Sequence, residues 1–441
     1  MYFRRDIDLD LLEWKDSESR KPLLIRGARQ VGKSSAVKNF SKNFKYYLEV
    51  NFEEENALKS LFEQSLTVEE LIIQLAVIKQ TPIIEGETLI FFDEIQVSIP
   101  AISSLRYFYE RKPKLHVIAA GSLLEFALAE LPSFGVGRVR SLFMYPFSFN
   151  EFLMALNEGA LSDLIKSSSE NKPLNSVVHV KLNQYLKKYF IIGGMPEAVR
   201  AYTQGNDLLE VQRVLNDLVI SIQSDFRKYN KRVPVSRIQA VFESVVKQTG
   251  SKYKYSNAMS DLNSVQIKQA LDLLELAGLL HTVTHSSCNG IPLGAESNPK
   301  KRKFLIFDTG IFQRMLGLDI ARLLLNDDYQ LINNGAIAEL FVGLELIKNT
   351  SRYAQMNLHY WHREEKSSQA EVDYVVQMGA KIVPIEVKAG SLGKMKSLHL
   401  FLREKQTSFG VRCSLENYSC YENIKTLPLY AIGHLFKTIT L

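Results

Sequence analysis

The sequence predicts an α/β protein: a parallel-sheet domain, then a smaller helical module, then a second α/β domain. Three observations predict this class. Gly27-Ala28-Arg29-Gln30-Val31-Gly32-Lys33-Ser34 lies between a short apolar run and a helix-like stretch. Two later apolar runs end in polar residues, at Asp93 and at Ser122. Near the end of the chain, two alternating segments flank a turn and carry charged residues, which is typical of a β-hairpin.

Length and composition limit the possibilities. A chain of 441 residues is too long for one hydrophobic core, so we expect two or three domains. No apolar run is as long as a membrane span, and the first residues lack the apolar segment of a signal peptide, so we expect a cytoplasmic protein without a membrane partner. Three cysteines without metal-ligand spacing favour free thiols. A net charge of +6 permits nucleic-acid binding but does not demonstrate it.

The first motif has the pattern of a phosphate-binding loop, G-x-x-x-x-G-K-[ST]. It follows an apolar run over 22–25 that predicts a buried strand, and it precedes a predicted helix over 34–43. The glycines let backbone N–H groups converge on phosphate oxygens at the helix N-terminus. We expect Lys33 to reach the β- and γ-phosphates of ATP and the Ser34 hydroxyl to ligate Mg²⁺. The predicted nucleotide-binding residues are Gly27, Ala28, Arg29, Gln30, Val31, Gly32, Lys33, Ser34, Ser35 and Asp93.

Periodicity predicts the elements around this loop. Leucine spacing over 6–14 predicts a short amphipathic helix, and alternation over 46–52 predicts a strand. Helices are predicted over 51–64 and 67–79, and Thr67 can cap the second.

The segment 88–96 (Thr-Leu-Ile-Phe-Phe-Asp-Glu-Ile-Gln) places an acidic pair after an apolar run, as a Walker B strand does. The run fits a parallel strand that is buried on both faces. Asp93 would emerge at the carboxyl end of this strand, beside the phosphate loop, and hold Mg²⁺ through water. Glu94 would polarise the attacking water as general base. The alternative is a buried strand that ends in a solvated acidic turn.

A third apolar run over 115–120 ends in Gly121-Ser122. Ser122 lies where additional-strand ATPases place a residue that senses the γ-phosphate, but it can equally cap the helix predicted over 123–131. The segment 135–140 carries Arg138 and Arg140, and either could act as an arginine finger. The alternative for both is a solvated basic loop.

The order of these segments resembles the prokaryotic AAA+-type ATPases that carry a conserved C-terminal domain of unknown function. The segments that carry the resemblance are 27–34, 92–96, 120–122, 137–140, 145–152, 189–197, 307–310 and 338–342. The resemblance covers most of the chain. It implies an ATP- and Mg²⁺-dependent ATPase in which Glu94, Lys33, Ser122 and Arg138 are catalytic. It also implies a homo-oligomer, because such sites receive an arginine from the neighbouring subunit. Thr is common where this loop has Ser34, and both hydroxyls bind Mg²⁺.

The middle of the chain changes character. Residues 162–176 are polar, which predicts a surface loop, and Gly193-Gly194-Met195-Pro196 predicts a break between helices. A long amphipathic helix is predicted over 208–225.

Residues 234–308 have the order of a winged helix. Helices over 235–249 and 264–277 are followed by a strand from 279 and a returning strand over 304–307. Such a module places its second helix in a DNA groove, although the same shape also serves protein contacts. The basic run 299–303 lies in the predicted wing, where it would contact phosphates or form a solvated loop.

The last domain carries a second group of charged residues. Alternation over 370–376 and 382–388 around a turn predicts a hairpin, and a period of two places Glu386 and Lys388 on the same face of its second strand. Asp373 followed by Glu386-x-Lys388 resembles the PD-(D/E)XK core of restriction endonucleases.

This second resemblance implies a nuclease site. Asp373 and Glu386 would bind Mg²⁺, and Lys388 would orient the attacking water or stabilise developing charge. Glu339, on a helix that starts near 335, matches the acidic residue that such folds place beside the metal. The alternative is a strand pair held by a cross-strand ion pair.

We therefore expect an AAA+-type ATP-binding domain over 1–205, a helical or winged-helix-like domain over 206–317 and a restriction-endonuclease-like domain over 318–441. The expected function is a Mg²⁺-dependent ATPase that couples its nucleotide state to DNA binding or processing. The alternative is a nucleotide-switched interaction protein whose nuclease-like domain is inactive.

Overall fold

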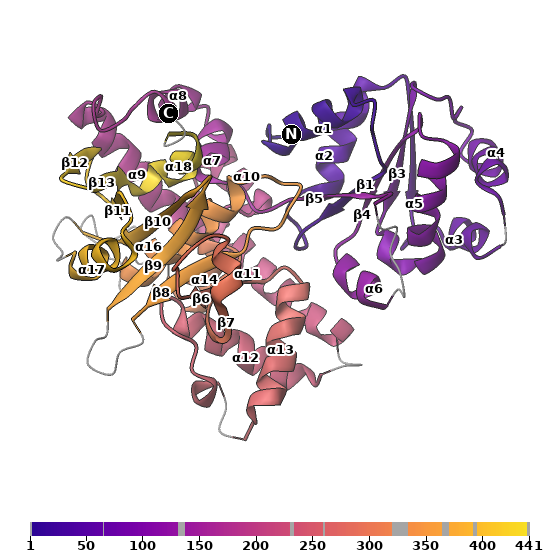
Figure 1. Ribbon diagram of the computed structural model, residues 1–441. Helices are drawn as coiled ribbons and strands as arrows, with labels where there is room; N and C mark the ends of the chain where they lie inside the picture. The colour runs from indigo at the N-terminus through magenta and orange to yellow at the C-terminus, as the bar shows by residue number, and fades with distance from the viewer. Residues whose placement is uncertain are drawn as a thin grey trace. The chain divides into compact units, whose positions relative to one another are not determined.

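The structure is a computed structural model that describes residues 2–64, 66–130, 137–229, 233–258, 261–319, 334–363, 370–390 and 395–438. The chain forms two compact units. The first comprises Met1–Tyr145 with the short segments Leu276–Gly278 and Ser351–Gln355, and the second comprises Pro146–Glu275, Leu279–Thr350 and Met356–Leu441. Figure 1 labels the elements of each unit along the chain.

The first unit is built on a five-stranded sheet with the order β2-β3-β4-β1-β5. All neighbouring strands run parallel. The strands are β1 (Leu23–Arg26), β2 (Tyr46–Asn51), β3 (Thr88–Asp93), β4 (His116–Ala120) and β5 (Arg140–Phe143). The strand β4 therefore lies between the strand before the phosphate loop and the Walker B strand. This confirms the predicted parallel sheet and the additional strand.

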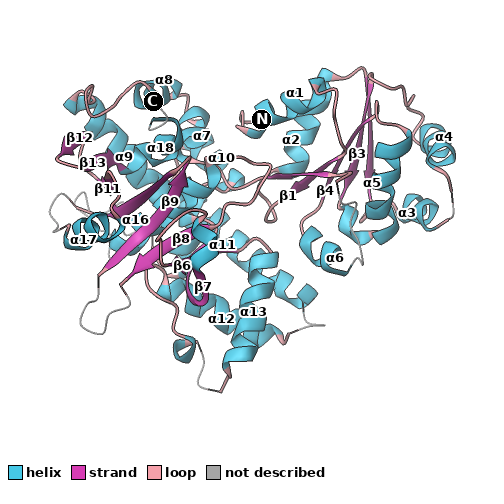
Figure 2. Cartoon of the chain, viewed as in Figure 1, coloured by secondary structure: helices cyan, strands magenta, loops and turns pink. Residues whose placement is uncertain are grey.

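Helices cover both faces of this sheet (Figure 2). They are α1 (Ile7–Asp16), α2 (Lys33–Phe40), α3 (Asn56–Glu63), α4 (Val68–Ile78), α5 (Ile99–Arg111) and α6 (Leu124–Glu130). One face packs Leu48, Ile90 and Phe92 against residues of α3, α4 and α5 in a single buried cluster. On the other face Trp14 of α1 contacts both Phe40 of α2 and His116 of β4. Both faces of the strands are covered, which explains why β3 and β4 consist of fully buried residues.

The second unit contains an eight-stranded mixed sheet with the order β12-β13-β11-β10-β9-β8-β6-β7. Its strands are β6 (Leu280–Ser286), β7 (Ser297–Ile306), β8 (Leu358–His362), β9 (Glu371–Met378), β10 (Lys381–Val387), β11 (Gly410–Ser414), β12 (Ser419–Tyr421) and β13 (Ile424–Pro428). The pairs β6–β7, β8–β9 and β9–β10 are antiparallel, whereas β6–β8 and β10–β11 are parallel.

The helices of the second unit are distributed along its whole sequence. They are α7 (Phe149–Ala155), α8 (Gly159–Lys166), α9 (Ser176–Ile192), α10 (Pro196–Gly205), α11 (Leu208–Asp225), α12 (Val235–Gln248), α13 (Ser264–Leu276, whose last residue belongs to the first unit), α14 (Thr309–Met315), α16 (Asn334–Lys348), α17 (Lys396–Lys405) and α18 (Leu435–Thr438).

Buried polar and aromatic contacts join three segments of the second unit that carry the family resemblance. Asp308 is fully buried; its carboxylate accepts hydrogen bonds from the backbone N–H groups of Gly194, at 2.7 Å, and of Ile311, at 3.0 Å. The Tyr189 ring lies 5.7 Å from the ring of Phe341 on α16. Buried carboxylates need such donors, so these residues stabilise the fold of the second unit.

Most predicted elements are confirmed within a few residues. The helix α4 begins at Val68 with a capping box between Thr67 and Glu70, and the break at 193–196 separates α9 from α10. The loop prediction was wrong for 162–166, because α8 extends to Lys166. The hairpin prediction is confirmed by β9 and β10, which pair in register from Lys381↔Met378 to Ile385↔Tyr374.

The structure groups the middle residues differently from the expected boundaries. The helices α12 and α13 form where the winged-helix pattern placed them, but β7 begins at Ser297, so the basic run 299–303 lies in this strand and not in the predicted wing loop. However, β6 also pairs with β8 in a parallel register, from Val283↔Leu358 to His285↔Tyr360. The β6–β7 hairpin therefore belongs to the same sheet as the strands of the expected terminal domain.

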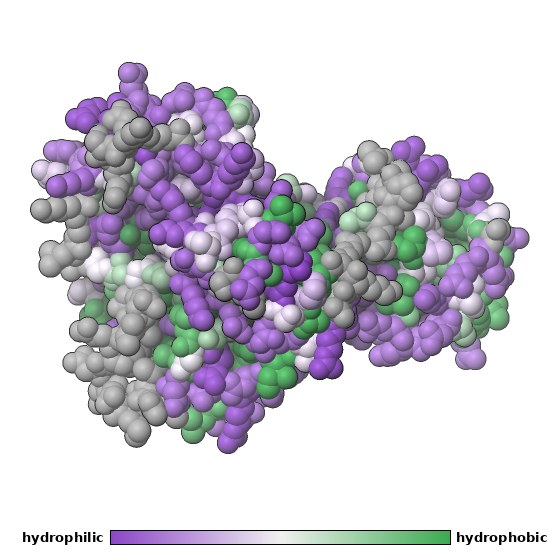
Figure 3. All heavy atoms as spheres, turned by 90° about the horizontal axis from the view of Figure 1, so that it is seen from below, coloured by the Kyte–Doolittle hydropathy of each residue, from purple (hydrophilic) through white to green (hydrophobic). Residues whose placement is uncertain are grey.

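The surface is dominated by polar residues on the face that Figure 3 presents, with smaller hydrophobic patches between them. Among the described helices, none combines the length and the apolar character needed to cross a membrane.

Candidate functional site

The predicted phosphate loop connects β1 to α2 and has the backbone that its sequence requires. Gly27 has a φ of 144° and Gly32 a φ of 98°, both in the region that favours glycine. A Cβ atom on Gly27 would lie 2.1 Å from the Met144 carbonyl oxygen, so only glycine fits there. The loop ends at the first turn of α2, where free N–H groups point away from the helix.

Lys33 lies against the loop that precedes it. Its Nζ donates hydrogen bonds to the carbonyl oxygens of Gly27, at 2.9 Å, and of Ala28, at 2.7 Å. Burial lowers the pKa of Lys33 to about 8, although the nearby carboxylates of Glu94 and Asp93 oppose this shift. The loop carbonyls thus hold the ammonium group at the site where the phosphates of ATP are expected.

Asp93 and Ser34 lie together at the carboxyl edge of the sheet. Asp93 is the last residue of β3, and its carboxylate is hydrogen-bonded to the Ser34 side chain. Burial raises the pKa of Asp93, while the hydrogen bond from Ser34 opposes the rise. A hydroxyl and a carboxylate side by side are hard oxygen ligands of the kind that Mg²⁺ prefers, so this pair fits the expected metal.

Three hydrogen bonds converge on one carboxylate oxygen of Glu94. Oε2 accepts from Gln96 Nε2 at 2.7 Å, from the Ser122 hydroxyl at 3.2 Å and from the Ser122 backbone N–H at 3.4 Å. Glu94 also has a φ of 48°, which is uncommon for a residue with a side chain. Glu94 and Ser122 lie close together because β3 and β4 are parallel neighbours. Glu94 follows β3 and Ser122 follows β4, both at the carboxyl edge of the sheet.

Gln96 is the residue of this site to which the sequence analysis assigned no role. Besides its bond to Glu94, its amide Oε1 is buried without a hydrogen-bond partner among the described residues. A Cβ atom on Gly121 would lie 1.9 Å from that oxygen, so Gly121 leaves the space that Gln96 occupies. The available signal was its position two residues after the predicted base.

The two candidate finger arginines lie away from the phosphate loop. Arg140 begins β5 and pairs in register with Leu23, at the amino end of β1, whereas the phosphate loop follows the carboxyl end of β1. The Arg138 Nε donates to Glu110 at 2.7 Å, and its side chain is 46% exposed. Neither arginine therefore adjoins the phosphate loop of its own chain.

The predicted nuclease-site residues meet in a second cluster, in the second unit. The carboxylate of Asp373, on β9, accepts from the Val387 N–H at 2.8 Å, and Lys388 Nζ lies 2.6 Å from Glu386 Oε1 on β10. Glu339, on α16, is buried beside them. The structure thus brings Glu339, Asp373, Glu386 and Lys388 to one end of the β9–β10 hairpin.

An unpredicted lysine lies inside this cluster. Lys303 Nζ on β7 is 2.8 Å from Glu339 Oε1, 2.6 Å from Glu371 Oε1 and 4.0 Å from Asp373 Oδ1. Its side chain is only 1% exposed. A second lysine, Lys252, lies 3.2 Å from the other oxygen of Glu371. Lys303 is part of the basic run 299–303, so the structure turns this member of the run inward rather than toward solvent.

The pKa values in the cluster follow from burial and from this lysine. Burial raises the pKa of Glu339 to about 7 against the opposing charge of Lys303, and burial together with Asp373 raises the pKa of Glu386 to about 7. Burial alone would lower the pKa of Lys303, but its carboxylate neighbours together outweigh burial and raise it.

The terminal cluster contains an ammonium group besides the predicted acids. Within the described part of the chain, no group of three or more His, Cys, Asp or Glu side chains is arranged to hold a metal ion. At the terminal cluster the Lys303 ammonium lies 2.8 Å from Glu339 and 4.0 Å from Asp373, whereas the expected metal ligands were Asp373 and Glu386.

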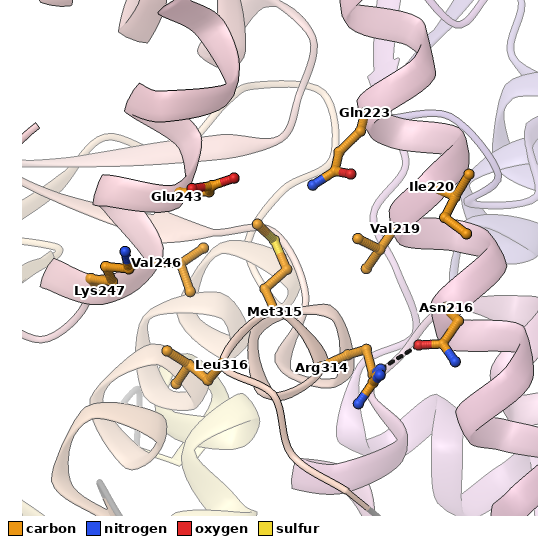
Figure 4. A pocket seen from close by; sticks show the side chains of 10 residues that line it. All are labelled: Asn216, Val219, Ile220, Gln223, Glu243, Val246, Lys247, Arg314, Met315 and Leu316. Carbon is orange, nitrogen blue, oxygen red and sulfur yellow. Dashed lines mark hydrogen bonds between the residues drawn. The ribbon is translucent and has the colours of Figure 1, made fainter. Parts of the chain in front are cut away.

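A separate pocket of about 660 Å³ lies between α11, α12 and the end of α14 (Figure 4). Val219, Val246 and Met315 give it an apolar lining, and Arg314 is hydrogen-bonded to Asn216 at its edge. None of the predicted site residues lines it.

Comparison with protein families matches three parts of the chain. Residues 19–153 match an AAA domain, residues 183–322 match a domain of unknown function (DUF8612), and residues 334–432 match another (DUF4143). A comparison with curated proteins gives no match.

Solved structures give distant likenesses of fold. A Walker-type ATPase of Pyrococcus abyssi is 16% identical in sequence, with a TM-score of 0.47. The aligned region covers 71% of this chain and 96% of that protein's chain. The Orc1 protein of Aeropyrum pernix in complex with DNA is 12% identical, with coverages of 73% and 95% and a TM-score of 0.29. Drosophila ORC bound to DNA is 14% identical, with coverages of 72% and 88% and a TM-score of 0.29.

The family match and the geometry of the first unit agree. The matched residues contain the phosphate loop, the Walker B strand and the additional strand between them, and these meet at one sheet edge. Residues 19–153 thus match an AAA domain and contain a P-loop fold, whose five strands all lie in the first unit.

Proposed function

We propose that the chain binds Mg·ATP at the phosphate loop and hydrolyses it with Glu94 as general base. One observation carries the proposal: Lys33, Ser34, Asp93, Glu94 and Ser122 lie together at the carboxyl edge of the β1-β4-β3 strands. Ligands of open parallel sheets bind at this edge.

Each residue has a distinct task in this proposal. The backbone N–H groups of the loop and the Lys33 ammonium would bind the phosphate oxygens, which requires Lys33 to leave its two carbonyl partners. Ser34 and Asp93 would hold Mg²⁺, which when bound offsets phosphate charge. Glu94 would accept a proton from the attacking water, and Gln96 and Ser122 hold its carboxylate in place.

The finer part of the proposal is that nucleotide state is coupled to DNA binding or processing in a homo-oligomer. The net charge of +6 and the exposed Lys300 on the β6–β7 hairpin favour a polyanionic partner. Arg140 pairs with the amino end of β1, and Arg138, two residues earlier, pairs with Glu110; these positions favour action on a neighbouring subunit over action on the chain's own ATP.

A second candidate comes from a different class: a nucleotide-switched interaction protein whose nuclease-like domain does not cut. The β9–β10 hairpin with Asp373 and Glu386, and Glu339 on α16 beside it, support a nuclease-like fold, but such a fold can host other functions. The ammonium of Lys303 among the acids favours this candidate.

ATP turnover of the purified chain, measured with and without duplex DNA, tests the first candidate. We expect turnover that depends on Mg²⁺ and rises with DNA. Turnover that DNA does not change would support ATP hydrolysis but contradict its coupling to DNA. A folded protein without turnover would contradict the proposed ATP hydrolysis itself.

Plasmid cleavage separates the two candidates. Metal-dependent cleavage that is lost in Lys388→Ala, with unchanged ATP turnover, would identify a nuclease. Absence of cleavage over a range of divalent cations favours the interaction protein.

A further inference from the structure

We propose that the Lys303 ammonium takes the place of a divalent cation among Glu339, Glu371 and Asp373, so that the nuclease-like cluster of the second unit is complete without a metal. The inference concerns the second unit alone and does not rest on the proposed ATPase.

The first argument is space. A bound Mg²⁺ or Mn²⁺ needs carboxylate oxygens at about 2.0–2.2 Å, drawn from several acids at once. Lys303 Nζ already lies 2.8 Å from Glu339 Oε1 and 2.6 Å from Glu371 Oε1, which are direct charge-assisted contacts. An ion that bridged Glu339 and Asp373 would occupy the same volume as the ammonium group.

The second argument is charge. Glu339, Glu371, Asp373 and Glu386 supply four carboxyl groups, and Lys252, Lys303 and Lys388 supply three ammonium groups within contact distance of them. The lysines therefore offset most of the negative charge. A divalent ion added a few ångströms from an ammonium in a poorly hydrated site would be strongly repelled, so the two cations exclude each other.

The third argument concerns the strands and the helix that position Lys303. Lys303 lies on β7, which is three strands from β9 in the sheet order. Its ammonium also lies 5.2 Å from the centre of the Tyr360 ring on β8. Its ammonium therefore contacts β8, β9 and α16, and its side chain is only 1% exposed.

Removing this ammonium should convert the cluster into a cation site. In Lys303→Met an apolar chain of similar length replaces the charge, leaving four carboxyl groups against two lysines. Glu386 Oε2, which is buried without a hydrogen-bond partner among the described residues, would become one oxygen available to an entering ion. Acids crowded in this way are relieved by binding a cation.

Equilibrium Mn²⁺ binding, followed by electron paramagnetic resonance of free Mn²⁺ without nucleotide, tests this. All proteins carry Asp93→Asn, so that the phosphate-loop site contributes no Mn²⁺. We expect no Mn²⁺ bound when Lys303 is present, about one bound in Lys303→Met, and none in the matched control Lys300→Met, which removes an exposed lysine from the same strand. Thermal melts should show stabilisation by Mn²⁺ in Lys303→Met alone.

Two results would overturn the inference. One is a folded Lys303→Met protein that binds no Mn²⁺, because the ammonium would then not occupy a cation position. The other is stoichiometric Mn²⁺ binding with Lys303 present that disappears in Asp373→Asn. This second arm needs no Lys303 variant, so the test stands even if Lys303→Met fails to fold.

Discussion

At the scale of single residues, the Glu94 carboxylate is the best-defined group of the first unit. Its oxygen Oε2 receives bonds from Gln96 and Ser122, and the residue adopts a left-handed backbone conformation that few side chains tolerate. A general base needs a fixed direction toward water, so the residues that fix it should affect the rate more than the binding of ATP.

Gln96→Ala should therefore lower kcat roughly tenfold or more while the Kd for ATP stays the same. The reason is that the Gln96 side chain is hydrogen-bonded to Glu94, the proposed base. Stopped-flow binding of a fluorescent ATP analogue and steady-state turnover measure the two quantities. Gln96→Asn, which keeps an amide on a shorter side chain, is the conservative comparison. An unchanged kcat in Gln96→Ala would show that Gln96 does not position the base.

Lys33→Ala should abolish ATP binding. The variant loses the one ammonium group that the loop carbonyls hold at the expected phosphate site, and such contacts contribute several kcal/mol in a poorly hydrated site. Isothermal titration calorimetry measures the loss. Lys38→Ala is the matched control, because Lys38 lies on the same helix but pairs with Glu49. ATP affinity equal to that of the unmodified protein would contradict the assigned role.

At the scale of elements, periodicity and motif spacing predicted the parts that chemistry constrains most. The phosphate-loop motif predicted a strand, a loop and a helix around Gly27. The structure shows why glycine is needed there, because a Cβ atom would collide with the Met144 carbonyl oxygen. The β9–β10 hairpin followed from simple alternation. Strands β5 and β8 escaped prediction because they are short and have no clear alternation, and their pairing partners are distant in sequence.

The β4 strand gives a pH prediction. Burial, aided by Arg20, lowers the pKa of His116 from 6.5 to about 4, and Lys15 and Asp16 are the other charged groups near it. Above pH 6.5 the imidazole is neutral in folded and unfolded chains and has no effect. Below 6.5 the unfolded chain binds a proton that the folded chain does not, so stability falls until about pH 4.

The loss attributable to His116 should reach at most about 3.5 kcal/mol, since the pKa falls from 6.5 to about 4 and one pKa unit corresponds to about 1.4 kcal/mol. Hydrogen exchange of β4 amides between pH 7 and pH 4, corrected for intrinsic rates, measures it. His116→Gln cannot titrate in this range and should lose less protection on acidification. Equal acid sensitivity of both proteins would rule out His116 as the cause.

At the scale of the whole molecule, the sequence could not predict which distant segments share a sheet. The expected boundary at 317 separated the β6–β7 hairpin from β8, yet β6 pairs with β8. The sequence also could not predict that Lys303 is buried, because a basic run does not reveal which of its residues faces the interior. Glu339, Asp373 and Glu386 were predictable from their motif, but the fourth acid, Glu371, and the Lys303 ammonium that joins it to Glu339 were not.

The arginine positions predict an assembly. Arg140 pairs with the amino end of β1, and Arg138, two residues earlier, pairs with Glu110, so their use in catalysis requires a second copy of the chain. Arg138→Ala and Arg140→Ala should each be tested, and one of them should lose hydrolysis while retaining ATP binding. Light scattering with ATP should show an oligomer. A monomer that hydrolyses ATP at the full rate would exclude an arginine finger supplied by a neighbouring subunit.

The most direct test of the central claim is hydrolysis by Glu94→Gln under single-turnover conditions, beside its affinity for Mg·ATP. Asp93 and Ser34 remain, so Mg·ATP should bind as tightly as in the unmodified protein, while hydrolysis should slow by roughly 100-fold or more. Wild-type hydrolysis in Glu94→Gln would contradict the account, because the residue held by Gln96 and Ser122 would then not be the base.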